Sequence, residues 1–512
     1  MIDQRPLKKI WMLAVGSRGD VQPYVAMAVA LQKNGYEVRF YTSENLVYLP
    51  ESFGITTISF WGKDNPMADS RASVNFIQFL KNLKAMSEAQ APHMAQVIHS
   101  EIEKGHLPDL VVSMHLTDSV AWYLAEKCNI PYYELLCQVF SFNPNHMQGG
   151  MPTLPFGLHG VIFKPFLGPH GSFLFHVWHE PYLKALDAAI AKQITRFKIS
   201  QFLSDSHLPN GVMFSKELSA VLHPQAPSHY HFLGATAFSE KDQCSNLDGF
   251  GGSNIMKTLD DFIKAGTKPI YVGWGSVITS TPEKMLEFCT RAVHHSGQRA
   301  IVLGGFAQLS LEMLETKASV DPAVIEYAKS NILFVSEAPH EWLFSKVSVT
   351  VHHGGAGTTT AAFRSGVPTI ITPAIFDQYD HSFLVRELQV GIGFKKQLDT
   401  IGWEELGDAI RTVVNDEDMA KRAVALSKKI RAEDGTVEFL SDLQSYWKDY
   451  CLTEEFHKRW AYAGGKEDQR AASRSKVITL AVFVGIAAMV VHYFVLPERY
   501  LPTKIIDLFQ AK

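Results

Sequence analysis

A glycine-rich stretch near residue 350 offers the clearest chemistry in this chain. Residues 351–360 read Val-His-His-Gly-Gly-Ala-Gly-Thr-Thr-Thr, after a β-branched run that predicts a short buried strand and before a run that predicts a helix. A glycine-rich turn between a strand and a helix lets backbone N–H groups approach a ligand, and the helix N-terminus behind it favours negative charge. The stretch therefore predicts a phosphate cradle, although a tight turn without a ligand has the same pattern.

The spacing of these glycines disfavours the two commonest phosphate loops, because it is neither G-x-x-x-x-G-K-[ST] nor G-x-G-x-x-G. The next predicted strand, residues 369–372, is followed by Asp377 and Gln378. A carboxylate beside an amide can accept and donate hydrogen bonds to vicinal hydroxyls. Phosphate groups on one turn and a polyol on the next predict a nucleotide-sugar site.

The elements that must position these turns are alternating strands and helices. Near the start of the chain, a strand over residues 10–15, a turn over 16–23, a helix over 24–32 and a strand over 37–42 form a β-α-β unit. Such a unit predicts a parallel sheet with its ligand crevice at the carboxyl ends of the strands. Asp20 stands at a strand end and at a helix entrance, where a carboxylate commonly caps the helix.

The second half of the chain repeats this alternation. A strand that ends in Gly-Trp-Gly-Ser at Ser276 opens it, and a helix from about Pro282 to His294 follows. Further strands are predicted over residues 299–304, 332–335 and 369–372. The polar, glycine-rich residues 239–252 indicate a linker between the halves. The pattern predicts the α/β class with two parallel-sheet domains.

The alternation is lost between residues 140 and 181, where prolines, glycines and large apolar side chains mix. A loop of this length inside a compact domain is usually functional or disordered, and this one is too apolar for disorder. It predicts a pocket for an apolar acceptor, with a satellite core under a long loop as the alternative. Phe142, Met147 and Phe156 are the candidate acceptor-binding residues of this stretch.

Composition bounds the remaining possibilities. A chain of 512 residues with 46% hydrophobic residues is long enough for two large α/β domains and is not disordered. Its formal charge of −4 argues against nucleic acid as the main partner. Five cysteines without a C-x-x-C pair, no N-x-[ST] sequon and no secretory signal favour a reducing compartment.

Residues 477–496 form a run without a formal charge. At about 1.5 Å per residue, a helix of that length spans roughly 30 Å, which is one hydrocarbon core. We expect a single C-terminal transmembrane anchor, with a buried terminal helix as the alternative. The expected localisation is a membrane, in particular the endoplasmic reticulum, with the catalytic domains in the cytosol.

Taken in order, Ala338–Phe344, His352–Thr359 and Asp377–Gln378 resemble the donor-binding block of nucleotide-sugar-dependent glycosyltransferases. The resemblance is strongest to the sterol glucosyltransferases and to the bacterial antibiotic-aglycone glycosyltransferases, of the family 1/28 type. Residues 16–23, Gly-Ser-Arg-Gly-Asp-Val-Gln-Pro, are similar to the N-terminal signature of the same group. The resemblance implies the GT-B fold, in which two Rossmann-like parallel-sheet domains face a cleft.

The resemblance also implies roles for particular residues. Asp20 is the general base that acts on the acceptor hydroxyl. Independently of the resemblance, neighbouring side chains on an extended strand point in opposite directions, so His352 is expected to serve packing or orientation. The donor-binding candidates are Ser276, His353, Gly355, Ala356, Gly357, Thr358, Asp377 and Gln378. Ser17 and Arg18 join the acceptor-binding candidates. No metal-ligand spacing appears near these residues, so no cofactor and no metal are expected beyond the UDP-sugar co-substrate.

Two positions depart from the plant small-molecule enzymes of the wider superfamily. Those enzymes carry a tryptophan that stacks on uracil where this chain has Glu337, and a ribose-binding glutamate where it has Ala361. The sterol and antibiotic branches share both departures. Uridine is favoured as the nucleoside, and thymidine stays open.

These features predict an inverting, metal-independent hexosyltransferase that uses UDP-glucose, or a close relative of it, on a lipophilic hydroxyl such as that of a sterol, terpenoid or glycolipid. The alternatives are a membrane-tethered subunit that binds sugar nucleotide or lipid without catalysis, and a transferase for lipid-linked glycan precursors. The predicted segments are an acceptor domain over 1–238, a linker over 239–267, a donor domain over 268–460, a juxtamembrane linker over 461–476, the anchor over 477–496 and a tail over 497–512.

Overall fold

The computed structural model describes most of the chain up to Ala463. The described residues are 6–62, 76–139, 175–196, 198–199, 202, 208–246, 249–250, 252–316, 319–375 and 377–463. The chain divides into two compact units, one of residues 1–196 and 207–457 and the other of residues 197–206 and 458–512. Both sheets and all the site residues discussed below belong to the first unit.

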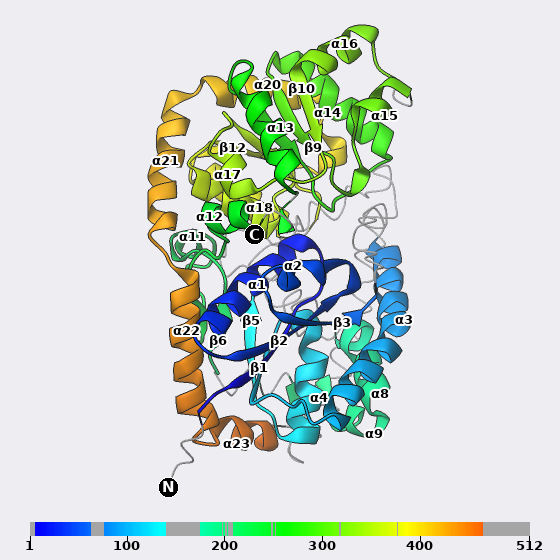
Figure 1. The fold of residues 1–512 in the computed structure, drawn as a ribbon, viewed down its shortest axis with the longest axis vertical. Helices are drawn as coiled ribbons and strands as arrows, with labels where there is room; N and C mark the ends of the chain where they lie inside the picture. The colour runs from blue at the N-terminus through cyan, green and yellow to red at the C-terminus, as the bar shows by residue number, and fades with distance from the viewer. Residues whose placement is uncertain are drawn as a thin grey trace, which may run out of the picture. The chain divides into compact units, whose positions relative to one another are not determined.

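The first sheet has seven parallel strands in the order β3-β2-β1-β4-β5-β6-β7 (Figure 1). Its strands are β1 Lys9–Leu13, β2 Glu37–Ser43, β3 Thr56–Trp61, β4 Leu110–Ser113, β5 Tyr132–Leu136, β6 Asn210–Val212 and β7 Tyr230–Phe232. The central strands β1, β4 and β5 are buried along nearly their whole length, as expected for strands that are covered on both faces. The order reverses between β1 and β4, and in such sheets ligands bind at that switch point.

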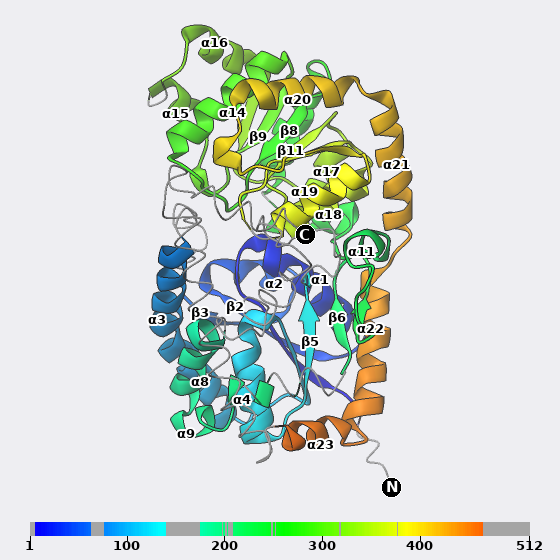
Figure 2. The same cartoon turned by 180° about the vertical axis from the view of Figure 1, so that it is seen from behind.

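The second sheet repeats this topology with six parallel strands in the order β10-β9-β8-β11-β12-β13 (Figure 2). Its strands are β8 Ile270–Gly273, β9 Ala300–Leu303, β10 Ile332–Val335, β11 Thr350–His352, β12 Thr369–Ile371 and β13 Gly391–Gly393. Here the switch point lies between β8 and β11, where Thr350 pairs with Tyr271 and His352 with Gly273. The parallel-sheet α/β architecture predicted from the sequence is confirmed.

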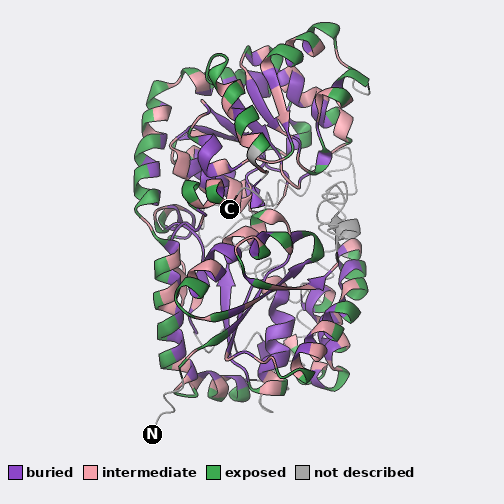
Figure 3. Cartoon of the chain, viewed as in Figure 1, coloured by how far each residue is buried: buried purple, intermediate pink, exposed green. Residues whose placement is uncertain are grey.

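Helices connect the strands of each sheet. The helices of the first half are α1 Arg18–Lys33, α2 Tyr48–Glu51, α3 Phe76–Glu103, α4 Asp118–Cys128, α8 Glu180–Leu186, α9 Ala188–Ala191 and α11 Lys216–Leu222, with a π-helical turn at Phe175–His179. Those that follow are α12 Glu240–Ser245, α13 Gly252–Lys264, α14 Pro282–Ser296, α15 Leu311–Thr316, α16 Pro322–Asn331, α17 His340–Phe344, α18 Ala356–Ser365, α19 Gln378–Glu387, α20 Trp403–Asn415, α21 Glu417–Arg431, α22 Gly435–Tyr446 and α23 Glu455–Tyr462, with a second π-helical turn at Trp447–Cys451. Figure 3 shows that the strands at the centre of each sheet are mostly buried and that the helices expose their outer faces.

One apolar cluster draws on both halves of the chain. It contains Leu136, Val139, Val212, Phe214, Leu218, Leu222 and Ala235 from the first half, and Phe363, Ile371, Leu384, Val385, Val390, Ala423, Leu426 and Ile430 from the second. We call it the shared core. Because burial of apolar surface is the main stabilising contribution to folding, the shared core ties the two sheets into one cooperative unit.

The chain returns to the first sheet after α21. Glu433, between α21 and α22, accepts hydrogen bonds at Oε1 from Ser215 Oγ (2.9 Å) and Glu217 N (3.1 Å) and at Oε2 from Ala235 N (2.9 Å). Both carboxylate oxygens are thus bound to residues that precede the second sheet. The helix α22 then contacts the first sheet, where the Tyr446 hydroxyl donates to the Tyr132 carbonyl at 2.7 Å.

The predicted C-terminal transmembrane helix is wrong for the chain as the structure describes it. Between residues 6 and 463, gaps aside, no helix is long and apolar enough to cross a membrane. The longest described helix, α3, has 28 residues but carries charged side chains along its length, including Lys81, Glu88 and Glu101. Residues 477–496, on which the prediction rested, lie outside the described residues. The fold class is corrected to two parallel-sheet halves without that helix, and the single-pass anchor and the localisation that depended on it are corrected with it.

Candidate functional site

The predicted phosphate cradle lies at the switch point of the second sheet. The strand β11 ends at His352, and the helix α18 begins at Ala356 with Gly355 as its N-cap residue. Gly355 has an extended backbone, and its side chain, a hydrogen atom, cannot cap the helix. The first N–H groups of α18 therefore lack a side-chain acceptor from the N-cap position and are available to an anionic ligand.

Two histidines hold the backbone of Gly354 from both sides. The Gly354 N–H donates to Nδ1 of His352 at 3.1 Å, so the proton of that imidazole is on Nε2, which donates to Thr369 Oγ1 at 2.9 Å. On the other side, Nδ1 of His381 donates to the Gly354 carbonyl at 2.6 Å. Both rings are buried. Their hydrogen bonds fix the shape of the turn, and this arrangement agrees with the orientation role expected for His352.

His353 lies beside the next glycine, Gly355. A Cβ on Gly355 would stand 2.4 Å from Nε2 of His353, so only glycine allows the ring to lie against the helix N-terminus. Its Nδ1 is buried, and no group of the described residues meets the distance and angle criteria for a hydrogen bond to it. Burial lowers the pKa of His353 to about 4, with the nearby Gly273 backbone opposing the fall. At neutral pH, His353 is thus an uncharged imidazole that can donate one hydrogen bond.

Gly354→Ala is expected to destabilise the protein. Gly354 has φ +93°, and a Cβ there would stand 2.7 Å from Cγ2 of Ile371 and 3.2 Å from the Gln378 carbonyl oxygen. Backbone strain and overpacking together should lower the free energy of unfolding by about 2–4 kcal/mol, measured by chemical denaturation. Gly357→Ala is the matched control, because its nearest contact would be an ordinary 3.5 Å and alanine favours a helix. Equal stabilities of the two variants would contradict the assignment of Gly354 to a strained, closely packed turn.

Asp20 lies in the first turn of α1, at the switch point of the first sheet. Its Oδ2 accepts hydrogen bonds from the Ser17 N–H at 2.7 Å and from Ser17 Oγ at 2.8 Å. The same oxygen would stand 2.6 Å from a Cβ on Gly16, whose φ is +129°. Burial raises the pKa of Asp20, with the Ser17 hydrogen bonds opposing the rise. With Oδ2 engaged by Ser17, we expect Oδ1 to be the oxygen that takes a proton.

Asp377 and Gln378 lie at the start of α19, after β12. Oε1 of Gln378 accepts hydrogen bonds from the N–H groups of Ala374 (2.8 Å) and Ile375 (3.1 Å), so this oxygen holds the loop and we expect the amide NH₂ to be the group offered to a ligand. Burial, and after it the charge of Asp20, raise the pKa of Asp377 to about 7. The Coulomb contribution places the carboxylates of Asp20 and Asp377 in one electrostatic environment.

Cys137 joins this environment from the carboxyl end of β5. Its thiol lies 3.7 Å from the Asp20 carbonyl oxygen. Burial raises the pKa of the thiol well above its usual range, and the charges of Asp20 and Asp377 add to the rise. A thiol with such a pKa stays protonated at neutral pH. Cys137 therefore lines the site as a neutral group and not as a nucleophile.

Ser17, Arg18 and Ser276 are also located by the structure. Ser17 is bound to Asp20 as described, and the Arg18 side chain contacts protein groups on several sides, among them Glu337 at 3.6 Å. Ser276 is half-buried after the end of β8. The preceding Gly275 carbonyl accepts the Phe306 N–H at 2.9 Å. The structure thus brings Asp20, Ser276, His353 and the Gly355–Thr358 turn to the carboxyl ends of the two sheets.

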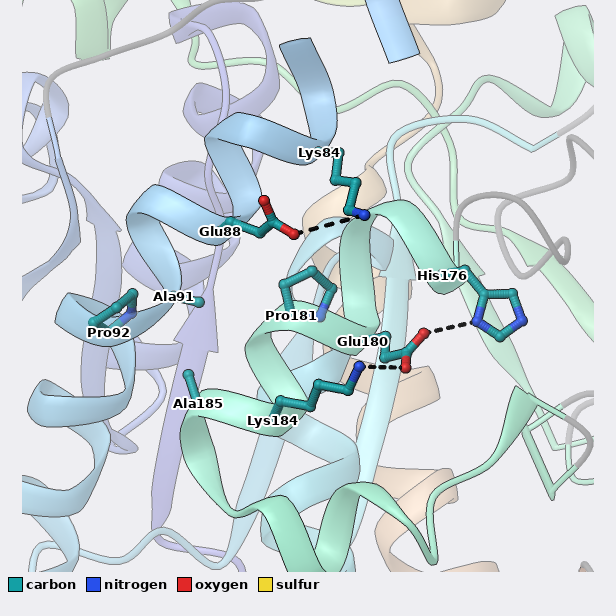
Figure 4. A pocket seen from close by; sticks show the side chains of 9 residues that line it. All are labelled: Lys84, Glu88, Ala91, Pro92, His176, Glu180, Pro181, Lys184 and Ala185. Carbon is teal, nitrogen blue, oxygen red and sulfur yellow. Dashed lines mark hydrogen bonds and ion pairs between the residues drawn. The ribbon is translucent and has the colours of Figure 1, made fainter. Parts of the chain in front are cut away.

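The other acceptor candidates, Phe142, Met147 and Phe156, lie outside the described residues. A cavity of about 300 Å³ does occur among the described residues of the first half, between α3 and α8 (Figure 4). Its charged side chains pair with one another, as in His176–Glu180 (2.8 Å) and Lys184–Glu180 (2.7 Å). This cavity shares no residue with the predicted site. Within the described part of the chain, no group of three or more His, Cys, Asp or Glu residues could hold a metal ion.

Comparison with known proteins shows which proteins the chain resembles. Residues 10–135 match the model of the glycosyltransferase family 28 N-terminal domain, and residues 300–445 match that of the erythromycin biosynthesis protein CIII-like C-terminal domain. The structure is similar to the glycotransferase of kitacinnamycin (TM-score 0.59, 16% identity, 86% of this chain and 100% of that chain) and to the calicheamicin glycosyltransferase CalG4 (TM-score 0.56, 16% identity, 87% and 99%). The fold is therefore GT-B, and the protein resembles the GT-B nucleotide-sugar-dependent glycosyltransferases in both halves.

Within that class, the sequence is similar to sterol 3-beta-glucosyltransferases. The one from Saccharomyces cerevisiae (strain YJM789) is 26% identical over 437 residues, which cover 83% of this chain and 34% of that protein. The one from Leptosphaeria maculans is 26% identical over 472 residues, which cover 89% and 31%. The chain thus spans about a third of the length of these curated relatives. The resemblance predicted from the sequence is confirmed.

Sequence reasoning gave no role to His381 and none to Cys137. His381 lies four residues after Asp377, and in a helix this spacing puts two side chains on one face. That spacing is the signal that could have identified His381 as part of the turn. Cys137 directly follows residues 130–136, whose pattern predicts a strand, so its place at a strand end could be predicted. Nothing in the sequence indicated its proximity to Asp20.

Proposed function

We propose that the protein is an inverting, metal-independent glycosyltransferase that moves glucose from UDP-glucose to a hydroxyl group of a lipophilic acceptor such as a sterol, terpenoid or glycolipid. The observation that carries the proposal is the approach of the two helix N-termini. The Gly19 carbonyl oxygen in the first turn of α1 lies 3.5 Å from where a Cβ on Gly357 would stand in the first turn of α18. A carboxylate and an anion-binding turn are thereby held next to each other. The similarity to sterol 3-beta-glucosyltransferases supports the lipophilic acceptor.

In the proposed reaction, Asp20 takes the proton of the acceptor hydroxyl as the acceptor oxygen attacks the anomeric carbon. The bond between the acceptor oxygen and the anomeric carbon forms while the bond to the diphosphate breaks, and attack from the opposite face inverts the configuration. The raised pKa of Asp20 suits this role, because a carboxylate with a higher pKa is a stronger base. Ser17 holds the side chain in place through Oδ2.

The leaving diphosphate gains negative charge in the transition state. The N–H groups at the start of α18, the hydroxyls of Ser276 and Thr358, and the imidazole of His353 are donors that can stabilise this charge. His353 is neutral at physiological pH, so it contributes a directed hydrogen bond and not a positive charge. Asp377 and the NH₂ of Gln378 hold the sugar hydroxyls, so that the anomeric carbon faces the acceptor.

The test is transfer of label from UDP-glucose to a panel of sterols, terpenoids and glycolipids, with TDP-glucose in parallel. Appearance of a glucosylated lipid, with the β configuration that inversion of the α-linked donor predicts, is the expected result. Addition of EDTA should leave the rate unchanged. Binding of UDP-glucose without transfer to any acceptor would support the binding-subunit alternative and overturn the proposal.

Donor affinity should depend on pH near neutrality. The pKa of Asp377 is raised to about 7, and its ionised form accepts hydrogen bonds from sugar hydroxyls at both oxygens and more strongly than the protonated form does. Affinity for UDP-glucose should therefore fall as the pH decreases below about 7, by up to tenfold per pH unit, in calorimetric titrations. The Asp377→Asn variant should bind UDP-glucose weakly at every pH, and its affinity should no longer depend on pH. An unchanged dependence in that variant would remove Asp377 from sugar binding.

The same shift has the opposite sign for stability. A carboxyl whose pKa is raised on folding binds its proton more tightly in the folded state than in the unfolded chain. This contribution of Asp377 to the free energy of unfolding is therefore complete below the unfolded pKa and is lost as the pH rises towards about 7. The ionised carboxylate of Asp377 therefore lowers the stability of the protein at neutral pH, at the place where the proposed sugar binds.

A further inference from the structure

The Arg18 guanidinium is held on several sides by protein groups. Nε donates to Gln22 Oε1 at 3.1 Å, Nη1 donates to the Tyr48 hydroxyl at 3.3 Å and Nη2 donates to the Gly249 carbonyl at 2.5 Å. The guanidinium also lies over the Phe250 ring, 4.9 Å from its centroid, in a cation–π geometry. A side chain with this many fixed contacts is poorly placed to follow a substrate. Its direction is set by the protein.

The remaining contact of Arg18 reaches the second sheet. Its Nη1 lies 3.6 Å from Oε2 of Glu337, which follows the end of β10. The two side chains are 30% and 43% exposed, so the pair contributes little to stability by itself. What it does provide is a direct connection between the first turn of α1 and the carboxyl end of a donor-side strand. Segment 249–250, which precedes α13, gives a second connection from the same guanidinium.

The first turn of α1 carries the proposed base. Oδ2 of Asp20 accepts hydrogen bonds from the N–H and the Oγ of Ser17, and these two residues flank Arg18 in the sequence. The N–H groups of Asp20 and Val21 also donate to the Ser17 carbonyl, at 3.0 and 3.1 Å. Hydrogen bonds therefore link residues 17–21 into one turn. Contacts that hold Arg18 in place therefore also restrict the position of the Asp20 carboxylate, two residues away.

We propose that Arg18 is a positioning residue. Through Glu337 and segment 249–250, it holds the turn that carries Asp20 in register with the second sheet, and so sets the distance from the base to the sugar held by Asp377 and Gln378. This inference rests on the proposed function and assigns Arg18 a role other than the acceptor contact that the family resemblance implied. Glu337 acts through Arg18 and not on the substrate.

The test is a double-mutant cycle on Arg18 and Glu337, with donor binding measured separately from turnover. Arg18→Ala should lower kcat by about tenfold or more, since small misplacements of reacting groups cost large factors in rate, while UDP affinity stays within about twofold. Glu337→Gln should lower kcat by a smaller factor, and the double variant should be no slower than Arg18→Ala alone. The reversed pair, Arg18→Glu with Glu337→Arg, should recover part of the loss of Arg18→Glu. Arg411→Ala, which breaks the Arg411–Asp408 ion pair on α20, is the matched control and should leave kcat unchanged.

A second measurement does not depend on activity. Amide hydrogen exchange at residues 19–21 should be faster in both Arg18→Ala and Glu337→Gln than in the wild-type protein, and unchanged in Arg411→Ala. Independent, multiplying effects on kcat, or an unchanged kcat in Arg18→Ala, would overturn the positioning role. If the wild-type protein transfers no sugar, the proposed function fails, and hydrogen exchange decides on the link alone. Unchanged exchange in both variants would then overturn it.

Discussion

Replacing Asp20 with asparagine is expected to abolish transfer while the protein still folds and binds donor. The asparagine amide oxygen can accept the hydrogen bonds that Ser17 N and Oγ give to Oδ2, so the first turn of α1 should keep its shape. What the variant loses is the ability to take a proton. General-base catalysis contributes about 10²–10⁴-fold to rate, and we expect kcat to fall by about that factor.

The measurement is single-turnover transfer at saturating UDP-glucose, with UDP affinity determined by calorimetry on the same preparation. Donor affinity within about twofold of wild type, together with the loss of transfer, would assign the effect to chemistry. Ser17→Ala is the control for the turn itself, because it removes one hydrogen bond to Oδ2 and leaves the carboxylate. It should reduce the rate far less than Asp20→Asn. Near-normal turnover of Asp20→Asn would exclude Asp20 as the base.

The second large effect is expected at His353. His353→Ala should lower kcat by about 10²–10³-fold, the usual cost of removing one preorganised donor to a developing negative charge. Because burial keeps the imidazole neutral, with a pKa of about 4, the rate should show no titration of His353 between pH 6 and 8. His353→Gln, which keeps a donor on a side chain of similar reach, should recover part of the loss.

His352→Ala separates this catalytic effect from a structural one. His352 is fully buried, and its two ring nitrogens are bound to Gly354 N and Thr369 Oγ1. Its removal leaves buried polar groups without partners and should cost about 1–3 kcal/mol of unfolding free energy, with a smaller effect on kcat than that of His353→Ala. If His352→Ala proves the slower enzyme and the more stable protein, the roles of the two histidines are reversed.

Much of this site could be predicted from the sequence because it depends on local patterns. A glycine-rich turn after a β-branched strand, and an Asp-Gln pair after the next strand, indicate their own positions at strand ends. Parallel strands then bring those ends to one edge of a sheet. The helix α1 shows the limit of this reasoning. Its start was predicted at Tyr24, but it begins at Arg18, because Ser17 and Asp20 form a capping box that the pattern of apolar residues does not reveal.

Pro23, inside α1, is a second feature of this helix whose structural consequence could not be predicted from the sequence. A residue at this position would normally donate its N–H to the carbonyl four residues earlier, which is that of Gly19. Proline has no N–H, so Gly19 keeps a carbonyl without that partner, and this oxygen is the one that faces Gly357 of α18. The sequence shows the proline, but the neighbour that it makes room for comes from the other half of the chain.

Contacts between residues distant in the sequence could not be predicted in the same way. The carbonyl of Gly354 accepts a hydrogen bond from His381, and Arg18 pairs with Glu337. Each of these contacts depends on how the loops after parallel strands fold over one another. The sequence shows which side chains are polar, and their roles stay predictions. The tertiary structure decides which atoms of these side chains stay available to a ligand.

The shared core has a consequence for how the protein is made. Side chains of the first half, such as Leu136, Val212 and Phe214, are buried against residues that include Leu426 and Ile430 near the far end of the described chain. During synthesis the first half therefore emerges with an apolar face that stays uncovered until the ribosome has finished α21. Large α/β proteins with such late contacts are prone to misassembly, and a nascent chain of this kind depends on chaperones for as long as that face is open. Expression of the first half alone would leave the same face permanently exposed to water, as a surface for aggregation.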